Sequence, residues 1–277
     1  MLPPLASRFV AGESAAAALE RARQLGEDDV GTILNLLGEH YHDRASADAD
    51  TETYCRLLSD IATTDLRIAL SVKPTQLGLA VGESVFRGNL ARILDRAKET
   101  GSAVWLDMED HTTTDATLDA FEHHARGGHR IGVCVQANLR RTREDLERLA
   151  GLSGTVRLVK GAYNPPASIA IQNSEAIDAA YREHLEYMFR EFDGGVAVGS
   201  HDPAMHAAAA TLQEIDGTDY EIQMLMGVRE SAQRDLARQR DVWQYVPYGN
   251  KWLSYFYRRV TENVDNAAFV LRALRSG

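Results

Sequence analysis

The sequence has only two cysteines, Cys55 and Cys134, among 277 residues. They lie far apart in apolar surroundings and lack the spacing of metal ligands, so we expect two reduced, buried thiols in a cytoplasmic protein. No run approaches the roughly 18 apolar residues of a membrane-spanning helix. The N-terminus also lacks the charged start and apolar run of a signal peptide. These absences predict a soluble protein and leave peripheral membrane contact open.

Basic residues are too few for a nucleic-acid-binding protein. The chain has 30 Lys and Arg against 40 Asp and Glu, a formal net charge of −10. Without a basic excess it cannot neutralise phosphates, so we predict no nucleic-acid partner. No G-x-G-x-x-G follows a strand-like run and no G-x-x-x-x-G-K-[ST] occurs, which excludes a Rossmann dinucleotide site and a P-loop.

What the chain does contain is an eightfold pattern: a short apolar run, a polar cluster and a segment of helical periodicity. Nearly continuous apolar runs are typical of parallel strands that are buried on both faces. The eight runs are residues 31–38, 67–73, 103–109, 130–137, 155–162, 195–201, 220–227 and 242–249. The segments expected to be helical are 45–62, 83–99, 114–126, 142–150, 174–192, 203–215, 229–240 and about 252–274.

Eight strands alternating with eight helices predict an α/β fold, a TIM-type (βα)8 barrel, as one catalytic domain over residues 1–277. Residues 1–28 are expected to be an extension whose helix, "ESAAAALERARQLG", packs on the outside. A start signal supports the alternation, because Asp202 precedes Pro203 at the head of one predicted helix. A doubly wound open sheet is the competing topology.

A polar or ionisable residue stands at the end of every apolar run, and in a barrel the chemistry lies at these carboxyl ends. Lys73, Asp107, Arg157 and Lys160 lie inside or at the lip of apolar runs, where an unpaired charge is costly. We therefore favour a functional site over a solvated rim. The residues at the run ends are Glu39, Lys73, Asp107, Glu109, Gln136, Lys160, Tyr163, His201, Gln223 and Tyr245.

Other chemistries fit parts of this set. His40, His42 and His201 make a partial metal set, but the last run, "VPYGN", offers no carboxylate to complete it, so we predict no metal. A lysine on a strand can form a Schiff base, so Lys73 or Lys160 keeps a lysine-dependent aldolase open. A carboxylate-binding protein without catalysis is a further alternative.

Near the end of the chain, "YFYRRVTENV" places the adjacent Arg258 and Arg259 before Glu262 at helical spacing. A solvated ion pair there would contribute only about 0.2–0.5 kcal/mol. The alternative is a fork that holds a substrate carboxylate, whose geometry the planar guanidinium group matches.

Seven strings, in order over about residues 30–265, resemble the flavin-dependent proline dehydrogenases: "LSVKPTQLG", "WLDMED", "VCVQANLRR", "VRLVKGAY", "GSHD", "EIQMLMGVR" and "YVPYGNKWLSYFYRRVTEN". The resemblance implies a distorted (βα)8 barrel, in agreement with the strand count, and FAD as cofactor. It implies oxidation of L-proline to Δ1-pyrroline-5-carboxylate by hydride transfer to FAD, the first step of proline catabolism to glutamate. Electrons then pass to a quinone-type acceptor.

The chain has no room for the aldehyde dehydrogenase domain that some members of this family carry, so we expect a single-function enzyme. Hydroxyproline dehydrogenase stays open, because one hydroxyl group changes only the pocket wall. The sequence indicates no oligomeric state.

By resemblance, Arg258 and Arg259 bind the proline carboxylate together with Lys73, and Glu262 holds one of the arginines in place. Tyr245 packs over the proline ring. Leu225 supplies an apolar wall of the substrate pocket. The carboxylate of Asp107 orients Lys73 and Tyr245 by hydrogen bonds.

The resemblance also implies a set of flavin contacts. Arg157 is the expected donor near flavin N5, where a cation stabilises the negative charge of the reduced ring. Glu39 is expected to pair with a clamp arginine and close the site. Asp202 stands where the family commonly has asparagine. Its negative charge would affect the relative affinity for FAD and FMN, unless Asp202 instead caps the next helix. The remaining expected contacts are Gln136, Val159, Lys160, Gly161, Tyr163, Ser200, His201 and Gln223.

Overall fold

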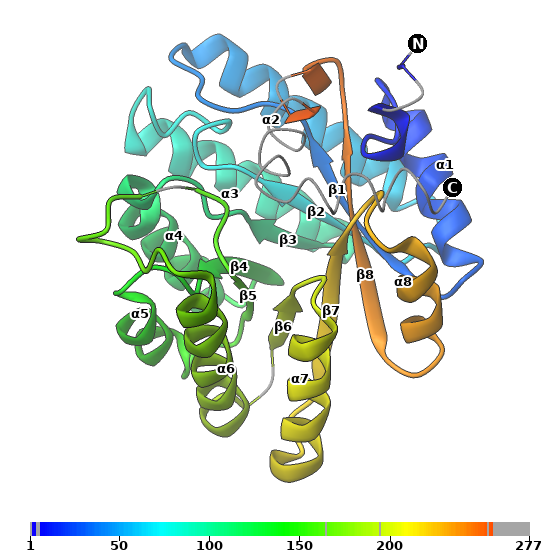
Figure 1. Ribbon diagram of the computed structural model, residues 1–277. Helices are drawn as coiled ribbons and strands as arrows, with labels where there is room; N and C mark the ends of the chain where they lie inside the picture. Colours follow the sequence, from blue (N-terminus) through cyan, green and yellow to red (C-terminus); the bar gives the residue numbers. More distant parts are fainter. Residues whose placement is uncertain (1, 4–5, 164, 194, 254, 257–277) are drawn as a thin grey trace.

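Eight parallel strands close into a barrel, and helices surround it (Figure 1). The computed structural model describes residues 2–3, 6–163, 165–193, 195–253 and 255–256. The strands are β1 (Gly31–Leu36), β2 (Ile68–Val72), β3 (Ala103–Leu106), β4 (Ile131–Gln136), β5 (Thr155–Val159), β6 (Val196–Gly199), β7 (Tyr220–Leu225) and β8 (Asp241–Tyr248). Each pairs with the next along the chain and β8 pairs with β1, so the predicted barrel is confirmed and the open sheet is wrong.

Eight α-helices lie in the described part of the chain, one before the barrel and seven between its strands. They are α1 (Ala15–Gly26), α2 (Arg44–Ile61), α3 (Glu83–Thr100), α4 (Thr114–Arg126), α5 (Thr142–Leu149), α6 (Ser174–Glu191), α7 (Pro203–Asp216) and α8 (Glu230–Ala237). Two 3-10 turns, Ala6–Arg8 and His111–Thr113, are also present, and residues 252–253 and 255–256 are helical. The predicted last helix, about 252–274, lies almost wholly outside the described residues.

Several predicted elements end too late. The run 103–109 is a strand only to Leu106, and the run 155–162 only to Val159. Gly161, with φ +124°, turns the chain after β5 in a conformation that favours glycine. The charged residues at the run ends therefore stand at the barrel mouth, just beyond the strands.

The predicted helix 229–240 is also too long at both ends. Arg229 has a left-handed backbone (φ 49°), so α8 begins one residue later. At the other end, the amides of Gln239 and Arg240 both donate to the carbonyl of Leu236, which forms a closing turn instead of a further helical turn.

The apolar side chains form two separate clusters, one inside the barrel and one between the strands and the helices. Ile33, Ala69, Trp105, Ala197 and Tyr245 pack together inside the barrel. The residues next to them, such as the buried Leu34, Leu70 and Leu106, belong to the larger outer cluster. Successive strand residues point to opposite faces, which explains why both faces of these runs are apolar.

Two tryptophans fill the interior because glycines face them. A Cβ atom at Gly132 would lie 2.4 Å from the Trp105 ring, and one at Gly31 would lie 2.5 Å from the Trp243 ring. Neither position could hold a side chain without moving the ring. Trp105 is only 5% exposed, so it is a core residue.

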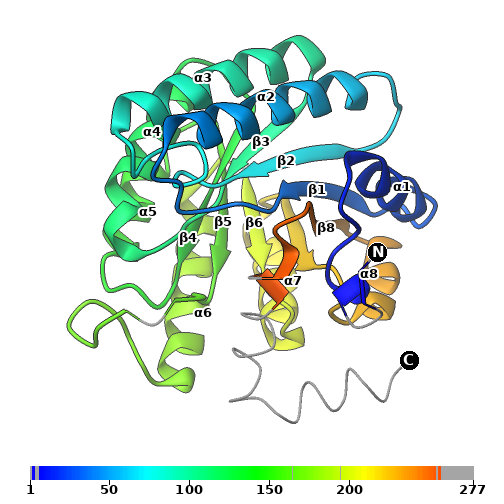
Figure 2. The same cartoon turned by 90° about the horizontal axis from the view of Figure 1, so that it is seen from above.

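The N-terminal helix α1 packs outside the barrel beside β1 and β8 (Figure 2). Its Ala18, Ala22 and Leu25 are buried in the outer cluster. On the same helix, Arg21 donates to Gln244 of β8 at 2.9 Å and to Glu230 of α8 at 2.7 Å. The predicted packing of this helix is therefore confirmed.

The two cysteines differ in burial. Cys134 of β4 is buried as predicted, whereas Cys55 is only half-buried, so that prediction is wrong. Cys55 lies on α2 with its sulfur 3.9 Å from the Arg92 carbonyl of α3, so it occupies the seam between two surface helices instead of the core. Both thiols are free.

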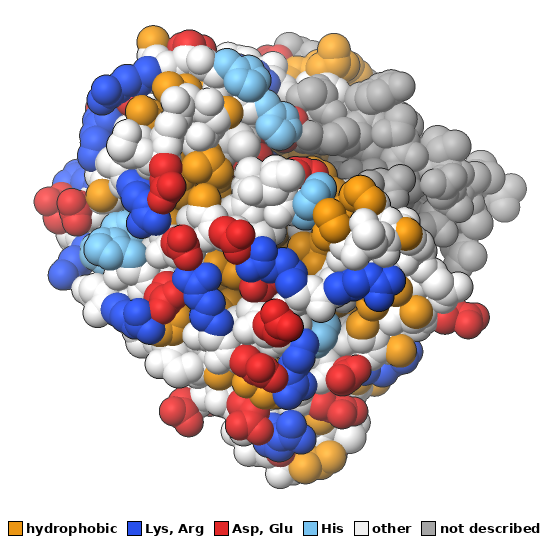
Figure 3. All heavy atoms as spheres, turned by 90° about the vertical axis from the view of Figure 1, so that its left-hand side faces the viewer, with side chains coloured by type: hydrophobic (Ala, Val, Ile, Leu, Met, Phe, Trp, Pro, Cys, Tyr) orange, Lys and Arg blue, Asp and Glu red, His pale blue; other side chains and the backbone are white. Residues whose placement is uncertain are grey.

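The surface carries acidic and basic side chains side by side, as the face in Figure 3 shows. Among the ion pairs that join neighbouring helices, Arg148 of α5 contacts Asp119 of α4 at 2.7 Å, and Arg141 contacts Asp115 at 2.6 Å. Within the described residues, no helix combines the length and apolar character needed to cross a membrane.

Acid is expected to destabilise the fold through His124 of α4. Burial, with His129 and His123 nearby, lowers the pKa of His124 to about 4 from 6.5. The unfolded chain therefore binds the proton first, and the free energy of unfolding decreases as the pH falls from 6.5 towards 4. Urea unfolding at pH 7 and pH 4.5 is expected to show a smaller loss for His124→Leu than for the unchanged protein.

His42→Leu is the control for this prediction, because His42 is exposed. An equal loss of stability on acidification in His124→Leu and in the unchanged protein would remove His124 as the cause.

Candidate active site

Asp107 lies at the centre of a hydrogen-bonded cluster at the barrel mouth. One carboxylate oxygen, Oδ1, accepts from Ser71 Oγ and Arg157 Nη2, both at 2.6 Å. The other, Oδ2, accepts from Tyr245 OH at 2.6 Å and from Lys73 Nζ at 3.1 Å. Four donors from three other strands and their ends therefore meet on one buried carboxylate.

Strand geometry explains this convergence. Ser71 and Lys73 are two residues apart and share the inward face of the chain at the end of β2. The register pairs Ser71 with Trp105 and Val72 with Leu106, so the next residues, Lys73 and Asp107, emerge side by side. The charged pair therefore follows from the register of two adjacent parallel strands.

Opposing effects set the charge of Asp107. Burial alone would raise its pKa, but Lys73, Arg157 and the bonds from Ser71 and Tyr245 outweigh it and lower the pKa to about 2. The side chain is therefore a carboxylate at neutral pH. It can orient and balance cations, and it is too weak a base to remove a proton there.

Lys73 Nζ lies within hydrogen-bond distance of Asp107 Oδ2, Asn35 Oδ1 (3.2 Å) and Tyr245 OH (3.3 Å). Because Asp107 Oδ2 and Tyr245 OH are only 2.6 Å apart, they share one side of the ammonium group. Burial opposes the charged form, but Asp107 and Glu109 outweigh it and raise the pKa of Lys73. A Schiff-base lysine needs the opposite shift, towards a neutral amine.

Lys160 is held charged in the same way. It pairs with Asp178 at 2.6 Å and Asp202 at 2.9 Å, and these partners outweigh partial burial and raise its pKa. Neither of the two candidate lysines is prepared as a nucleophile, so the aldolase alternative is not favoured.

Tyr245 and Leu225 lie next to each other on paired strands, as the register of β7 and β8 shows. Both belong to the interior cluster. Burial raises the pKa of Tyr245 well above its usual value, and Asp107 raises it further, so the phenol stays neutral. The two side chains present an apolar surface beside a fixed hydroxyl group.

Arg157 is a buried cation below this surface. Its guanidinium carbon lies 5.1 Å from the Trp105 ring centre and 5.8 Å from that of Tyr245. Besides Asp107, it donates to Gln223 Oε1 at 2.9 Å. Arg157 and Gln223, two of the residues expected to contact the flavin, are thus hydrogen-bonded to each other.

The other expected flavin positions lie around the ends of β4, β5 and β6. Gln136 donates to the Glu109 carbonyl at 3.2 Å and accepts from the Ala162 amide at 3.3 Å. Gly161 approaches Asn138 so closely that a Cβ atom would lie 2.4 Å from Asn138 Oδ1. Val159 and Lys160 are partly buried in this turn, Gly161 is exposed, and Tyr163 is partly buried beyond it.

Ser200 and His201 follow β6 and have structural contacts of their own. His201 Nε2 accepts from the Leu225 amide at 2.9 Å. Asp202, the next residue, caps α7 by accepting from the Ala204 amide at 2.9 Å. The capping alternative for Asp202 is therefore confirmed, and its charge is balanced by Lys160.

The residues of this mouth fit a flavin. The buried guanidinium of Arg157 and the amide groups of Gln136 and Gln223 are the donor and acceptor types that flavin rings bind. Asn138 Oδ1 is buried and finds no hydrogen-bond partner in the described part of the chain. An orphaned acceptor beside a glycine turn is available to a ligand donor.

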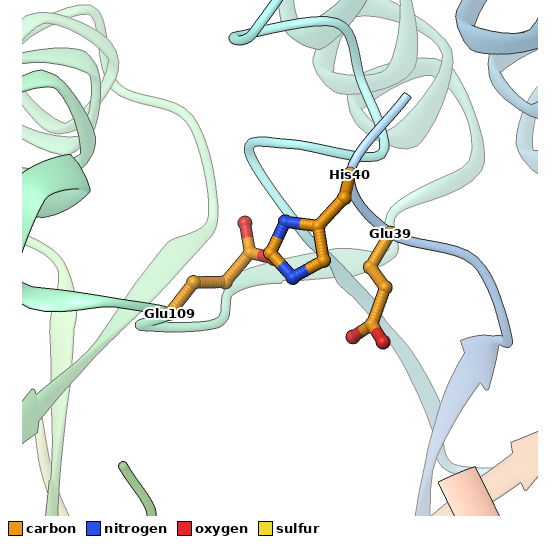
Figure 4. A group of neighbouring side chains, drawn as sticks. All are labelled: Glu39, His40 and Glu109. Carbon is orange, nitrogen blue, oxygen red and sulfur yellow. The ribbon is translucent and has the colours of Figure 1, made fainter. Parts of the chain in front are cut away.

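Three side chains at the mouth, Glu39, His40 and Glu109, bring their possible ligand atoms within 4.8 Å of one another (Figure 4). This trio differs from the partial metal set predicted from His40, His42 and His201, in which the His201 ring is engaged by Leu225. Glu109 is fully buried and accepts from the Thr75 amide at 2.8 Å and hydroxyl at 2.6 Å.

The same threonine fixes the strained loop that carries the histidine. His40 has a left-handed backbone, φ 54°, and its amide donates to Thr75 Oγ1 at 2.9 Å. Thr75 therefore joins the loop after β1 to the loop after β2, and Glu109 ties Thr75 to the loop after β3. Glu39 lies in the same loop, beyond the end of β1.

Arg258, Arg259 and Glu262 lie outside the described residues, so the carboxylate clamp and its pairing with Glu39 stay predictions. Two residues that the sequence analysis did not single out, Asn35 and Ser71, do join the site. Each is a polar residue within an apolar run, on the strand face that bears other site residues, and this pattern could have revealed them.

A family model described as "Proline dehydrogenase" matches residues 18–272. The chain is 32% identical over 273 residues to proline dehydrogenase 1 of Bacillus subtilis, covering 97% of this chain and 90% of that protein. It is 34% identical over 282 residues to proline dehydrogenase of Deinococcus radiodurans, covering 99% and 91%.

Two solved structures of proline utilization A share the fold. That from Bdellovibrio bacteriovorus, inactivated by N-propargylglycine, has a TM-score of 0.83 at 23% identity and is matched by 94% of this chain. That from Bradyrhizobium japonicum has a TM-score of 0.80 at 21% identity and is matched by 96%. The chain spans 32% of each of these longer proteins, so the likeness concerns the barrel.

Proposed function

The chain belongs to the proline dehydrogenase family, and from this premise we propose that it oxidises L-proline to Δ1-pyrroline-5-carboxylate with FAD as cofactor. When bound, FAD supplies the acceptor for a hydride from the ring carbon beside the proline nitrogen. The observation that carries the proposal is the buried Asp107 carboxylate that gathers Lys73, Arg157 and Tyr245 at the barrel mouth.

Lys73 attracts the carboxylate of proline by its charge. Its bonds to Asn35, Asp107 and Tyr245 hold the ammonium group in place at the barrel mouth. Arg258 and Arg259 supply further hydrogen bonds to the substrate carboxylate, as their adjacency in the sequence suggests.

Tyr245 and Leu225 hold the proline ring, which is small and apolar. Their neighbouring positions in the β7–β8 register make one wall. Because the Tyr245 hydroxyl is held by Asp107 and Lys73, the ring of Tyr245 cannot turn freely, and a substrate that packs on it is held in one orientation.

FAD would be held by Arg157, Gln136 and Gln223 at its ring and by the turn around Gly161 further along. Ser200, His201, Val159, Lys160 and Tyr163 complete the proposed contacts. The cation of Arg157 stabilises negative charge that develops on the reduced cofactor. Asp107 keeps this cation in place by the 2.6 Å bond to its Nη2 atom.

Electrons leave the reduced enzyme for a quinone-type acceptor, and we propose a cytoplasmic enzyme that meets its acceptor at a membrane surface. Reoxidation assays with a soluble quinone, and with the same quinone in lipid vesicles, test this step. Faster reoxidation by the quinones than by molecular oxygen supports it, and reoxidation by oxygen alone contradicts it.

An absorbance spectrum before and after L-proline is added without oxygen tests the proposed function. Bands at about 450 nm that bleach with proline are the expected result for a bound flavin that accepts the hydride. Hydroxy-L-proline in a parallel sample ranks the two substrates. A protein that stays colourless after FAD is supplied, or a flavin that proline does not bleach, contradicts the proposal.

A further inference from the structure

Beneath the site, Glu221 of β7 connects to Arg157 through Gln223. Gln223 Nε2 donates to Glu221 Oε1, and Gln223 Oε1 accepts from Arg157 Nη1. We propose that Glu221 is a positioning residue for proline oxidation, which fixes the Gln223 amide and through it the guanidinium of Arg157. The inference rests on the proposed function, because Arg157 matters there as the cation beside the cofactor.

The chemistry of arginine dictates which way the amide must point. A guanidinium group only donates hydrogen bonds, so the carbonyl oxygen of Gln223 has to face Arg157. The NH2 group then faces the opposite way along the strand, where Glu221 accepts from it. Without that acceptor, the NH2 group of a buried amide loses its partner, and a flipped amide would point hydrogens at a cation.

The contact follows from strand geometry. Glu221 and Gln223 are two residues apart on β7 and share its inward face. Gln223 is 4% exposed and Arg157 is 6% exposed, so water offers little replacement for a lost partner. The same inward face carries Leu225 two residues further on, next to Tyr245. Glu221 thus acts on the site from below without touching it.

Charges of both signs face Glu221. Desolvation raises the pKa of Glu221 to about 7, and Asp241 of β8 raises it, whereas the Gln223 bond, Arg157 and Arg67 lower it. Asp241 stands opposite Glu221 in the register and pairs with Arg67. A protonated Glu221 can still accept from Gln223 through its carbonyl oxygen, so glutamine is a fair mimic of that form.

The test compares Glu221→Leu, Glu221→Gln and the control Asp241→Asn in the FAD-loaded protein. Glu221→Leu is expected to slow anaerobic flavin reduction by proline about 10-fold, with the KM for proline changed less than about 2-fold. It is also expected to make the flavin midpoint potential more negative. Glu221→Gln should restore both, because it keeps an acceptor for the Gln223 amide. Asp241→Asn, at the same end of the barrel, should leave both unchanged.

Two results overturn the inference. One is a Glu221→Leu enzyme with the unchanged rate and potential. The other is a Glu221→Gln enzyme as slow as Glu221→Leu, because charge and not orientation would then matter. Glu221→Met, of similar length, replaces the leucine variant if that one does not fold. If proline fails to reduce the unchanged protein, the proposed function fails, and the midpoint potentials still test Glu221.

Discussion

Asp107→Asn is expected to lower kcat/KM for proline by about 10²- to 10³-fold, the range seen when a preorganised charged contact is removed. All four partners of Asp107 are donors, and they share its two oxygens in pairs. Asparagine has one acceptor oxygen and an NH2 group, so one of the two cations, Arg157 or Lys73, must face hydrogens, because neither can accept a hydrogen bond. Lys73 and Arg157 also lose the carboxylate that balances them.

Steady-state kinetics and the anaerobic rate of flavin reduction check this prediction. Asp110→Asn is the matched control, because Asp110 belongs to the same "DMED" string and caps a surface turn through the Thr112 amide. A normal reduction rate in Asp107→Asn, with normal KM, would show that the cluster has no part in the reaction.

The same substitution should change the response of stability to acid. Asp107 has a pKa of about 2 in the folded protein against 3.8 as its ordinary value. The depressed pKa means that its stabilising contribution is present above pH 3.8 and is lost as the pH falls towards 2. Asp107→Asn is therefore expected to be less stable at neutral pH and to lose less stability in that acid window.

Arg157→Met is expected to slow flavin reduction by about 10²-fold while FAD stays bound, because the buried cation that stabilises the reduced cofactor is gone. The loss of Arg157 also removes one of the cations that lower the pKa of Asp107, so that pKa rises. Gln223 Oε1 and Asp107 Oδ1 each lose a donor. Rapid-mixing absorbance and the flavin midpoint potential measure the effect.

Arg157→Lys separates charge from shape. An ammonium group keeps the cation, but it lacks the planar fork with which Arg157 reaches Asp107 and Gln223 together. We expect its reduction rate to lie between those of the unchanged enzyme and Arg157→Met. If Arg157→Met has a normal flavin spectrum, potential and reduction rate, Arg157 does not belong to the flavin environment.

Periodicity along the chain was sufficient to predict the barrel. Eight apolar runs separated by helical segments can bury both faces of each strand in only a few folds. In this chain the strands form a closed barrel. The strand ends were harder to predict. Residues 107–109 were included in the predicted run, but the register with β2 stops at Leu106. Hydrogen bonding between distant segments, and not composition, decides where a strand stops.

The charged residues within apolar runs were recognisable in the same way, because an unpaired buried charge is too costly to occur by chance. Lys73, Asp107 and Arg157 stood out for this reason, and the structure places them in contact. Asn35 and Ser71 did not stand out, since an uncharged polar side chain costs less to bury and gives a weaker pattern.

The sequence by itself thus determined the parallel barrel, the packing of the N-terminal helix and the residue types at the barrel mouth. These depend on local periodicity and on the cost of burying charge, which are properties of the chain. The tertiary structure alone decided that Lys73 contacts Asn35 and Tyr245, that Asp107 gathers four donors, and that Glu221 faces Gln223. Such pairings depend on the register of strands that are far apart in sequence, and no local pattern encodes that register.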